Sequence, residues 1–203
     1  MREATVSQKI IPILPEHIPL HIYSLDEATK AVSRISQAAA RYGKAYLGLA
    51  VKRTRKGNID SLALGTCREV VIITLKGSSA SNDQLLNLLA GPTSDQTGQL
   101  TLVAFGMARI AIQLSGWASD SPVVGIDLST SVEGGARNPS RPSEKLLSRV
   151  SSDVEISEVH DLWGTSFDTE ASDEKLCLRA WITAWCAVFL PLYDDGHNLT
   201  GYS

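Results

Sequence analysis

The chain has 203 residues, 43% of them hydrophobic, and a formal net charge of −3 at pH 7. This composition excludes a disordered chain and is enough for one domain with a real core. The slightly negative charge provides no global basic surplus, which proteins that live on phosphate backbones usually show.

The cysteines and the apolar runs indicate in which cellular compartment the protein is expected. Cys67, Cys177 and Cys186 are odd in number, widely spaced and form no Cys-x-x-Cys pair. This argues against a disulfide framework and against a zinc site, and favours buried thiols in a reducing compartment. The N-terminus has no signal-peptide pattern, and no apolar run reaches the length of a membrane span. We therefore expect a soluble intracellular protein of the nucleus or cytoplasm, with no membrane contact.

The first half of the chain predicts strands around one helix. We expect residues 1–17 to be a loose lead-in and residues 18–24 to be a short edge strand. Residues 25–42 place apolar side chains on one face of a helix, which Gly43 ends. Three apolar segments then predict a meander of strands: residues 44–51, 59–66 and 68–75.

The second half alternates helices and strands before a loop-rich region. Helical patterns begin near residues 82 and 107, and apolar strands are predicted at residues 100–105 and 122–130. Residues 133–169 are rich in Gly, Pro and Ser, so we expect a loop-rich insertion with one helix near residues 144–150. A strong apolar helix begins at Asp173 and extends to about Tyr193. The resulting order predicts one domain over residues 18–195, a tail over residues 196–203, and a mixed sheet of five to six strands with helices on both faces.

Four stretches occur in an order and at spacings that resemble one family. They are YLGLAVK at residues 46–52, IDSLALGT with VVII at residues 59–66 and 70–73, LVAFGMARI at residues 102–110, and LRAWITAW at residues 178–185. Together they resemble the DEDD-type 3′–5′ exonuclease domain, in the subgroup of ribonuclease D and the Werner-syndrome exonuclease. The resemblance runs from about Pro19 to Tyr193 and implies a ribonuclease H-like α/β fold.

The residues on which this family's chemistry depends are replaced here. Ala50 and Lys52 stand where the resemblance places an Asp and a Glu, and the next acid falls on Ile110 or within a residue of it. In the last helix, Arg179 replaces a tyrosine and Thr183 an aspartate. The family holds two divalent cations about 3.5–4 Å apart with carboxylates, and magnesium prefers oxygen ligands. We therefore expect no bound metal, no cofactor and no nuclease activity.

Two further clusters bear on partners. Cations in the turn at residues 52–56 and beside the former active-site positions are candidates for phosphate contacts: Lys52, Arg53, Arg55, Lys56, Arg109 and Arg179. Trp181, Trp185 and Phe189 form an aromatic stripe at a spacing of four residues, which is typical of a core helix and is also a candidate protein interface. A displaced metal site built from Asp60, Asp127 and Asp161 has no spacing to recommend it.

These patterns give three hypotheses. The first is a catalytically inactive exonuclease-like domain that acts as a scaffold or adaptor in an RNA-processing or RNA-silencing assembly, with a protein partner or as a homodimer. The second is a non-catalytic binder of RNA or single-stranded nucleic acid that uses the former active-site groove. The third, and the weakest, is an active metal-dependent exonuclease with relocated ligands.

Overall fold

A computed structural model of the chain describes residues 1–40, 45–54, 58–75, 83–90, 100–118, 123–131, 140–163 and 171–189. These contain the strands β1 (Arg2–Ser7), β2 (His17–Ser24), β3 (Ala45–Arg53), β4 (Ile59–Gly65), β5 (Val70–Thr74), β6 (Leu100–Ala104) and β7 (Ile126–Asp127). The α-helices are α1 (Ala28–Ala40), α2 (Asp83–Leu89), α3 (Met107–Ala118), α4 (Ser140–Val150), α5 (Ile156–Trp163) and α6 (Asp173–Phe189). Short 3₁₀ helices, Leu25–Glu27 and Leu128–Ser131, precede α1 and follow β7.

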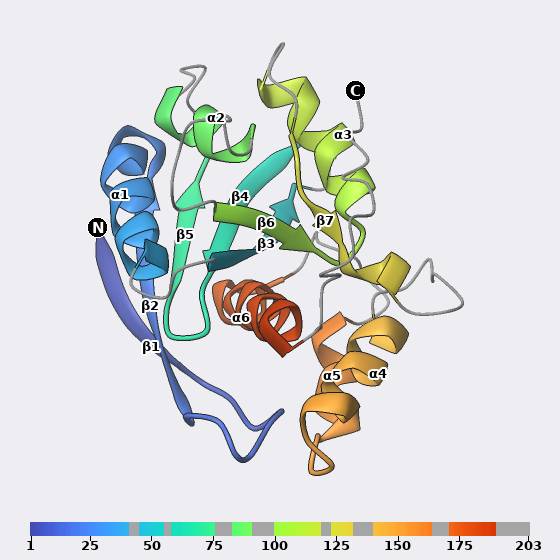
Figure 1. Ribbon diagram of the computed structural model, residues 1–203. Helices are drawn as coiled ribbons and strands as arrows, with labels where there is room; N and C mark the ends of the chain where they lie inside the picture. The colour runs from blue at the N-terminus through green and yellow to red at the C-terminus, as the bar shows by residue number, and fades with distance from the viewer. Residues whose placement is uncertain are drawn as a thin grey trace.

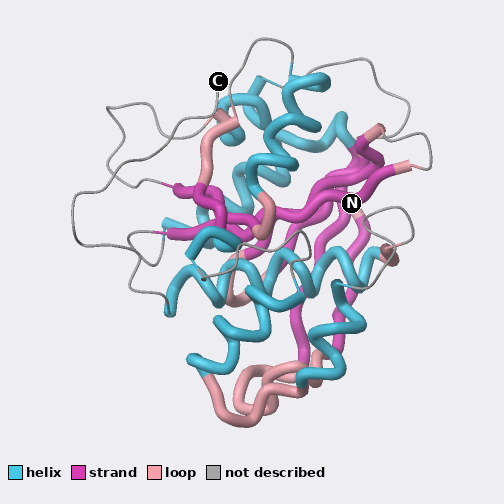
Figure 2. Tube along the Cα trace, turned by 90° about the vertical axis from the view of Figure 1, so that its right-hand side faces the viewer, coloured by secondary structure: helices cyan, strands magenta, loops and turns pink. Residues whose placement is uncertain are grey.

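The strands form one mixed sheet in the order β1-β2-β5-β4-β3-β6-β7. The meander β3-β4-β5 is antiparallel, whereas β2 pairs parallel with β5, and β6 pairs parallel with both β3 and β7. Helices cover both faces: α6, α4 and α5 lie on one, and α1, α2 and α3 on the other (Figures 1 and 2). The predicted mixed α/β architecture is confirmed, with seven strands in the described residues rather than five or six.

Each face of the sheet closes its own apolar core, because successive side chains of a strand point to opposite sides. Along β3, Leu47, Leu49 and Val51 join the core beneath α1, α2 and α3. Ala50 joins the other core, which α6 fills with Trp181, Ile182 and Cys186 among others. The strand that carries the family-like motif is therefore buried on both sides.

Residues 1–17 do not form a loose lead-in. β1 pairs antiparallel with β2 along its whole length, so β1 is the edge strand and β2, which the sequence placed at the edge, lies inside the sheet. The link between them is folded as well: the Gln8 side-chain amide donates to the Ile11 and Pro15 carbonyls and accepts from the Ile11 amide, each at 3.0 Å. Ile11 is fully buried.

The loop-rich prediction for residues 133–169 is wrong in part. The expected helix begins earlier, at Ser140, and a second helix, α5, was not predicted. Leu146 and Leu147 of α4 and Val159, Leu162 and Trp163 of α5 all enter the core on the α6 side. The link between the β1–β2 segment and this pair is direct, because the Glu155 amide donates to the Ile10 carbonyl at 3.0 Å. Residues 132–139 and 164–170 lie outside the described residues, as does the predicted tail.

The helices that the structure describes include none with the length and apolar character needed to cross a bilayer.

Candidate functional site

Two glycines bring α6 into backbone contact with the centre of the sheet. Gly48 of β3 and Gly65 of β4 lie opposite each other across the two strands. A Cβ atom on Gly48 would overlap the Ala180 carbonyl oxygen and lie 2.7 Å from the Ala184 amide nitrogen, and one on Gly65 would lie 2.7 Å from the Ala180 carbonyl carbon. Only glycine permits so close an approach. This close approach of α6 to the sheet determines the surroundings of four predicted site residues: Ala50, Lys52, Arg179 and Thr183.

Ala50 of β3 and Thr183 of α6 are both small and buried. Ala50 lies two residues beyond Gly48 on the same face of β3 and is 5% exposed, and Thr183 is fully buried. The Thr183 hydroxyl donates to the Arg179 carbonyl of its own helix at 2.6 Å, which is the usual bond of a threonine inside a helix. Neither residue presents a carboxylate, and the threonine hydroxyl proton is already used.

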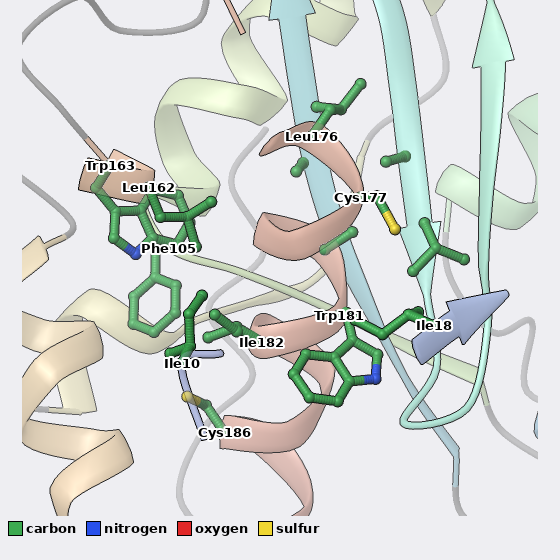
Figure 3. Close-up of a cluster of buried hydrophobic side chains, with 14 of the residues drawn as sticks. Ile10, Ile18, Phe105, Leu162, Trp163, Leu176, Cys177, Trp181, Ile182 and Cys186 are labelled. Carbon is green, nitrogen blue, oxygen red and sulfur yellow. The ribbon is translucent and has the colours of Figure 1, made fainter. Parts of the chain in front are cut away.

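Arg179 carries a positive charge into the interior on the side of α6 that faces α5. Its side chain is 4% exposed, and its Nε donates to the Leu162 carbonyl at 2.9 Å. The guanidinium carbon lies 5.4 Å from the centroid of the Trp163 ring, a distance at which a cation is attracted to an aromatic face. Trp163 in turn meets Phe105 edge-to-face at 5.4 Å (Figure 3). Arg179 therefore joins α6 to the end of α5.

Lys52 carries a second cation to the edge of the same region. Its side chain is 23% exposed, and its Nζ lies 3.9 Å from Asp60 Oδ2 on β4 and 3.9 Å from Asp173 Oδ1 at the start of α6. Arg2 of β1 contacts the other oxygen of Asp173 at 3.0 Å. The register of β3 against β4 shifts between Lys52 and Arg53, at this point of the strand. The lysine thus links β3, β4 and α6 by long ion pairs.

Ile110 does not join these residues. It is buried on α3 in the core on the opposite face of the sheet, together with Met107 and Leu114. Its neighbour Arg109 is exposed. Among the other predicted phosphate contacts, Arg53 is partly buried at the end of β3, and Arg55 and Lys56 lie outside the described residues.

The acids proposed for a displaced metal site stay apart. Asp60 accepts from the Ser61 hydroxyl at 3.2 Å and faces Lys52. Asp127 Oδ1 caps the turn after β6, accepting from the amides of Gly106 at 3.0 Å and Ser129 at 2.9 Å. Asp161 is exposed on α5. In the part of the chain that the structure describes, no three His, Cys, Asp or Glu side chains gather into a group that could hold a metal ion. The side chains between β3 and α6 do not fit a pair of divalent cations.

The aromatic stripe of α6 divides between core and surface. Trp181 is 1% exposed, and its Nε1 donates to the Cys67 carbonyl at 3.1 Å. Trp185 is half-buried and meets Trp181 edge-to-face, with ring centroids 6.0 Å apart. Both line a pocket of about 480 Å³ together with Pro15, His17, Ile18, Cys67 and Arg68. The Phe189 side chain lies outside the described residues.

Sequence reasoning missed this pocket because its walls come from three distant segments. Apolar Ile10 and Ile11 at the N-terminus were the available signal that residues 1–17 are packed against the domain.

Comparisons with known proteins bear on the fold. No protein-family model matches this sequence, and no curated protein matches it. Among solved structures, ribonuclease D of Escherichia coli, described as an exoribonuclease involved in structured RNA processing, aligns with 83% of this chain and 44% of its own, at 16% identity and a TM-score of 0.54. The Nibbler EXO domain of Aedes aegypti (13% identity, 83% and 84% covered, TM-score 0.49) and the EXD2 exonuclease domain (16%, 83% and 85%, 0.44) align less well.

The chain therefore has the ribonuclease H-like fold of exonuclease domains. At this identity the likeness extends to the fold alone.

Proposed function

We propose that this chain is a catalytically inactive exonuclease-like domain that acts as a protein-interaction scaffold or adaptor. One observation carries the proposal: Gly48 of β3 meets the backbone of Ala180 and Ala184 of α6, and Ala50, Thr183 and Arg179 on the same two elements are all buried. The family resemblance requires carboxylates in this contact. Alanine has no side-chain oxygen to offer a metal ion, and threonine offers only a neutral hydroxyl, whose proton is donated to the Arg179 carbonyl.

Electrostatics support the proposal. Magnesium loses its water reluctantly and is held by anionic oxygens. Unit charges of like sign 4 Å apart repel by about 4 kcal/mol at an effective dielectric constant of 20. Lys52 and Arg179 bring ammonium and guanidinium groups to the region where the resemblance expects acids. A single lost acid could be replaced by a neighbour, whereas here alanine, lysine and threonine stand at three of the expected acid positions, and a buried arginine lies on the same helix as the threonine.

We prefer the scaffold hypothesis to nucleic-acid binding because Lys52 and Arg179 already contact other groups of the protein. The binding hypothesis needs Lys52 and Arg179 to face a groove. Arg179 is instead buried against Trp163 and the Leu162 carbonyl, and Lys52 faces Asp60 and Asp173. An RNA-processing or RNA-silencing assembly is the proposed setting, with a protein partner or a second copy, in the nucleus or cytoplasm. That setting rests on analogy with the exonuclease fold.

A nuclease assay tests the inactive state. The full chain is incubated with 5′-labelled single-stranded RNA and DNA in magnesium or manganese, beside an active ribonuclease D. We expect no shortening of either strand above the buffer control. The variant Lys52→Met is purified in parallel, because a contaminating nuclease would cleave equally in both preparations. Metal-dependent cleavage by the unaltered chain at a rate that Lys52→Met changes would overturn the proposal.

A purification experiment tests the scaffold role. The tagged chain is isolated from its source cells, and its mass is measured by light scattering. A stoichiometric protein partner or a stable dimer supports the role. A monomer that binds single-stranded RNA, with affinity falling steeply as salt rises, would favour the nucleic-acid hypothesis instead.

A further inference from the structure

The pocket beside Trp185 lies on the opposite flank of α6 from Arg179. Figure 3 shows Trp181 beside Ile18 on one flank of the helix, and Phe105 and Trp163 beyond the other. His17 and Ile18 begin β2, and Cys67 and Arg68 belong to the turn between β4 and β5. The pocket therefore has no wall in common with the former active-site positions Ala50, Arg179 and Thr183.

The apolar floor of this pocket is fixed in place. Trp181 is fully packed and anchored to the β4–β5 turn through its bond to the Cys67 carbonyl, and it supports Trp185 edge-to-face. Pro15, Ile18 and Cys67 complete the apolar lining. A half-buried tryptophan that is held rigid loses little entropy when a ligand packs on it, and such residues commonly dominate binding energy.

The rim of the pocket is basic, although the whole chain is slightly acidic. Arg68 and His17 are exposed and line it, and the lining residues include no acid. Burial raises the pKa of the Cys67 thiol to about 11, and the charge of Arg68 acts against that rise.

We propose that this pocket binds a short acidic segment of a partner protein, with a bulky apolar side chain against Trp185 and a carboxylate against Arg68. The proposal rests on the proposed function as an interaction domain. A volume of about 480 Å³ is in the range of small-ligand sites and suits one or two side chains rather than a folded domain. Arginine binds carboxylates through paired hydrogen bonds, so the charge also sets the direction of the segment.

Nucleic acid fits the pocket less well. Tryptophan and arginine together can stack and hold a base, but single-strand binding also needs a row of cations along the backbone. The lining supplies one permanent cation, and Pro15 and Ile18 offer apolar surface that suits a side chain.

Selection from a displayed library of random dodecapeptides, with the full chain as bait, tests the proposal. We expect enriched sequences to carry Phe, Trp or Leu flanked by Asp or Glu. The dissociation constant of the best peptide, measured by fluorescence anisotropy, should rise at least tenfold for Arg68→Glu. The matched variant Arg149→Glu reverses an exposed charge on α4 and should change it less than twofold. A control peptide in which Asn and Gln replace Asp and Glu should bind weakly, and Arg68→Glu should change its dissociation constant little.

Several results would overturn the proposal: no enrichment, enriched peptides without acids, or equal binding by Arg68→Glu. Stoichiometric competition by a dT12 oligonucleotide would assign the pocket to nucleic acid. Circular dichroism of each variant controls for folding. If the peptide experiment fails while the chain stays inactive as a nuclease and keeps a partner that Arg68→Glu does not weaken, the pocket proposal fails alone. Nuclease activity would instead remove the proposed function, whatever the peptides show.

Discussion

The two flanks of α6 differ in how completely they are packed. On one, Arg179 lies against Trp163 and bonds the Leu162 carbonyl, so the end of α5 closes the helix off from solvent. On the other, Trp185 is only half-buried, and the β4–β5 turn leaves a pocket beside it. Arg179 lies on the closed flank, and the accessible aromatic surface of Trp185 lies on the open one.

This difference teaches that spacing along a helix does not decide exposure. Trp181 and Trp185 are neighbours on one stripe, yet one is completely buried and the other is not. The cause is the β4–β5 turn, whose Cys67 carbonyl accepts from Trp181. A charged residue can equally be core, because the arginine on the other flank finds a carbonyl and an aromatic ring inside the fold.

The largest expected effect comes from disrupting the close backbone contact between Gly48 of β3 and α6, on which the packing of both flanks depends. Gly48→Ala places a methyl group on the Ala180 carbonyl oxygen, which is backbone and cannot rotate away. We expect a loss of at least about 4 kcal/mol in the free energy of unfolding, measured by urea denaturation. The control is Gly106→Ala: this glycine has φ +73° and open space around its Cβ position. Its cost should be about 1–2 kcal/mol of backbone strain. Equal costs for the two variants would show that α6 does not rest on Gly48.

The next prediction tests whether a carboxyl group at residue 50 is simply buried or can help to bind a metal ion. Ala50→Asp places a carboxyl group at a position that is 5% exposed, and Ala50→Asn is the uncharged control of the same shape. Burial disfavours the charged carboxylate, and the nearby Lys52 offsets only part of this cost because it is partly exposed and already faces Asp60 and Asp173. At pH 7 the Asp variant should therefore be less stable than the Asn variant by about 2 kcal/mol.

The sign of the pH dependence follows from the same reasoning. A buried carboxyl has a raised pKa in the folded state, so the deficit of the Asp variant should be small near pH 4 and grow as the pH rises. Thermal melts of the pair across pH 4–8 measure it. Added manganese should not raise the melting temperature of the Asp variant. A manganese-dependent rise in its melting temperature, without one for Asn, would show that this position can still accept a metal.

Much of the fold could be predicted from residues alone, because buried strands and amphipathic helices leave periodic patterns. The apolar runs of β3, β4 and β5 are clear since both of their faces are covered. β1 was missed for the opposite reason: as an edge strand it is mostly polar, and Val6 is its one buried residue. α5 is short and lies in a region rich in loop-forming residues.

The candidate site could be predicted only in part. The motif order indicated Ala50, Lys52, Arg179 and Thr183, which all lie at or beside the contact between β3 and α6. The position of Ile110 depended on the rotation of α3, which a sequence match with a one-residue uncertainty cannot determine, since one residue turns a helix by 100°. The pocket beside Trp185 has walls from residues 15–18, 67–68 and 181–185, and no local pattern brings these together.

The smallest expected effect concerns the open flank and is a change in the alkylation rate of the Cys67 thiol. Cys67 is half-buried in the pocket wall, and burial raises the pKa of its thiol to about 11. At pH 8 roughly one such thiol in a thousand is ionised, so iodoacetamide should label it far more slowly than in the urea-unfolded chain. The rate should rise with pH up to about 11. Arg68→Glu replaces the nearby cation with an anion and should slow labelling further, whereas Arg149→Glu should not, as followed by mass spectrometry. Labelling at pH 8 that ignores the charge at residue 68 would mean that Arg68 does not act on the pocket, and the acidic segment proposed to bind there would lose its cationic contact.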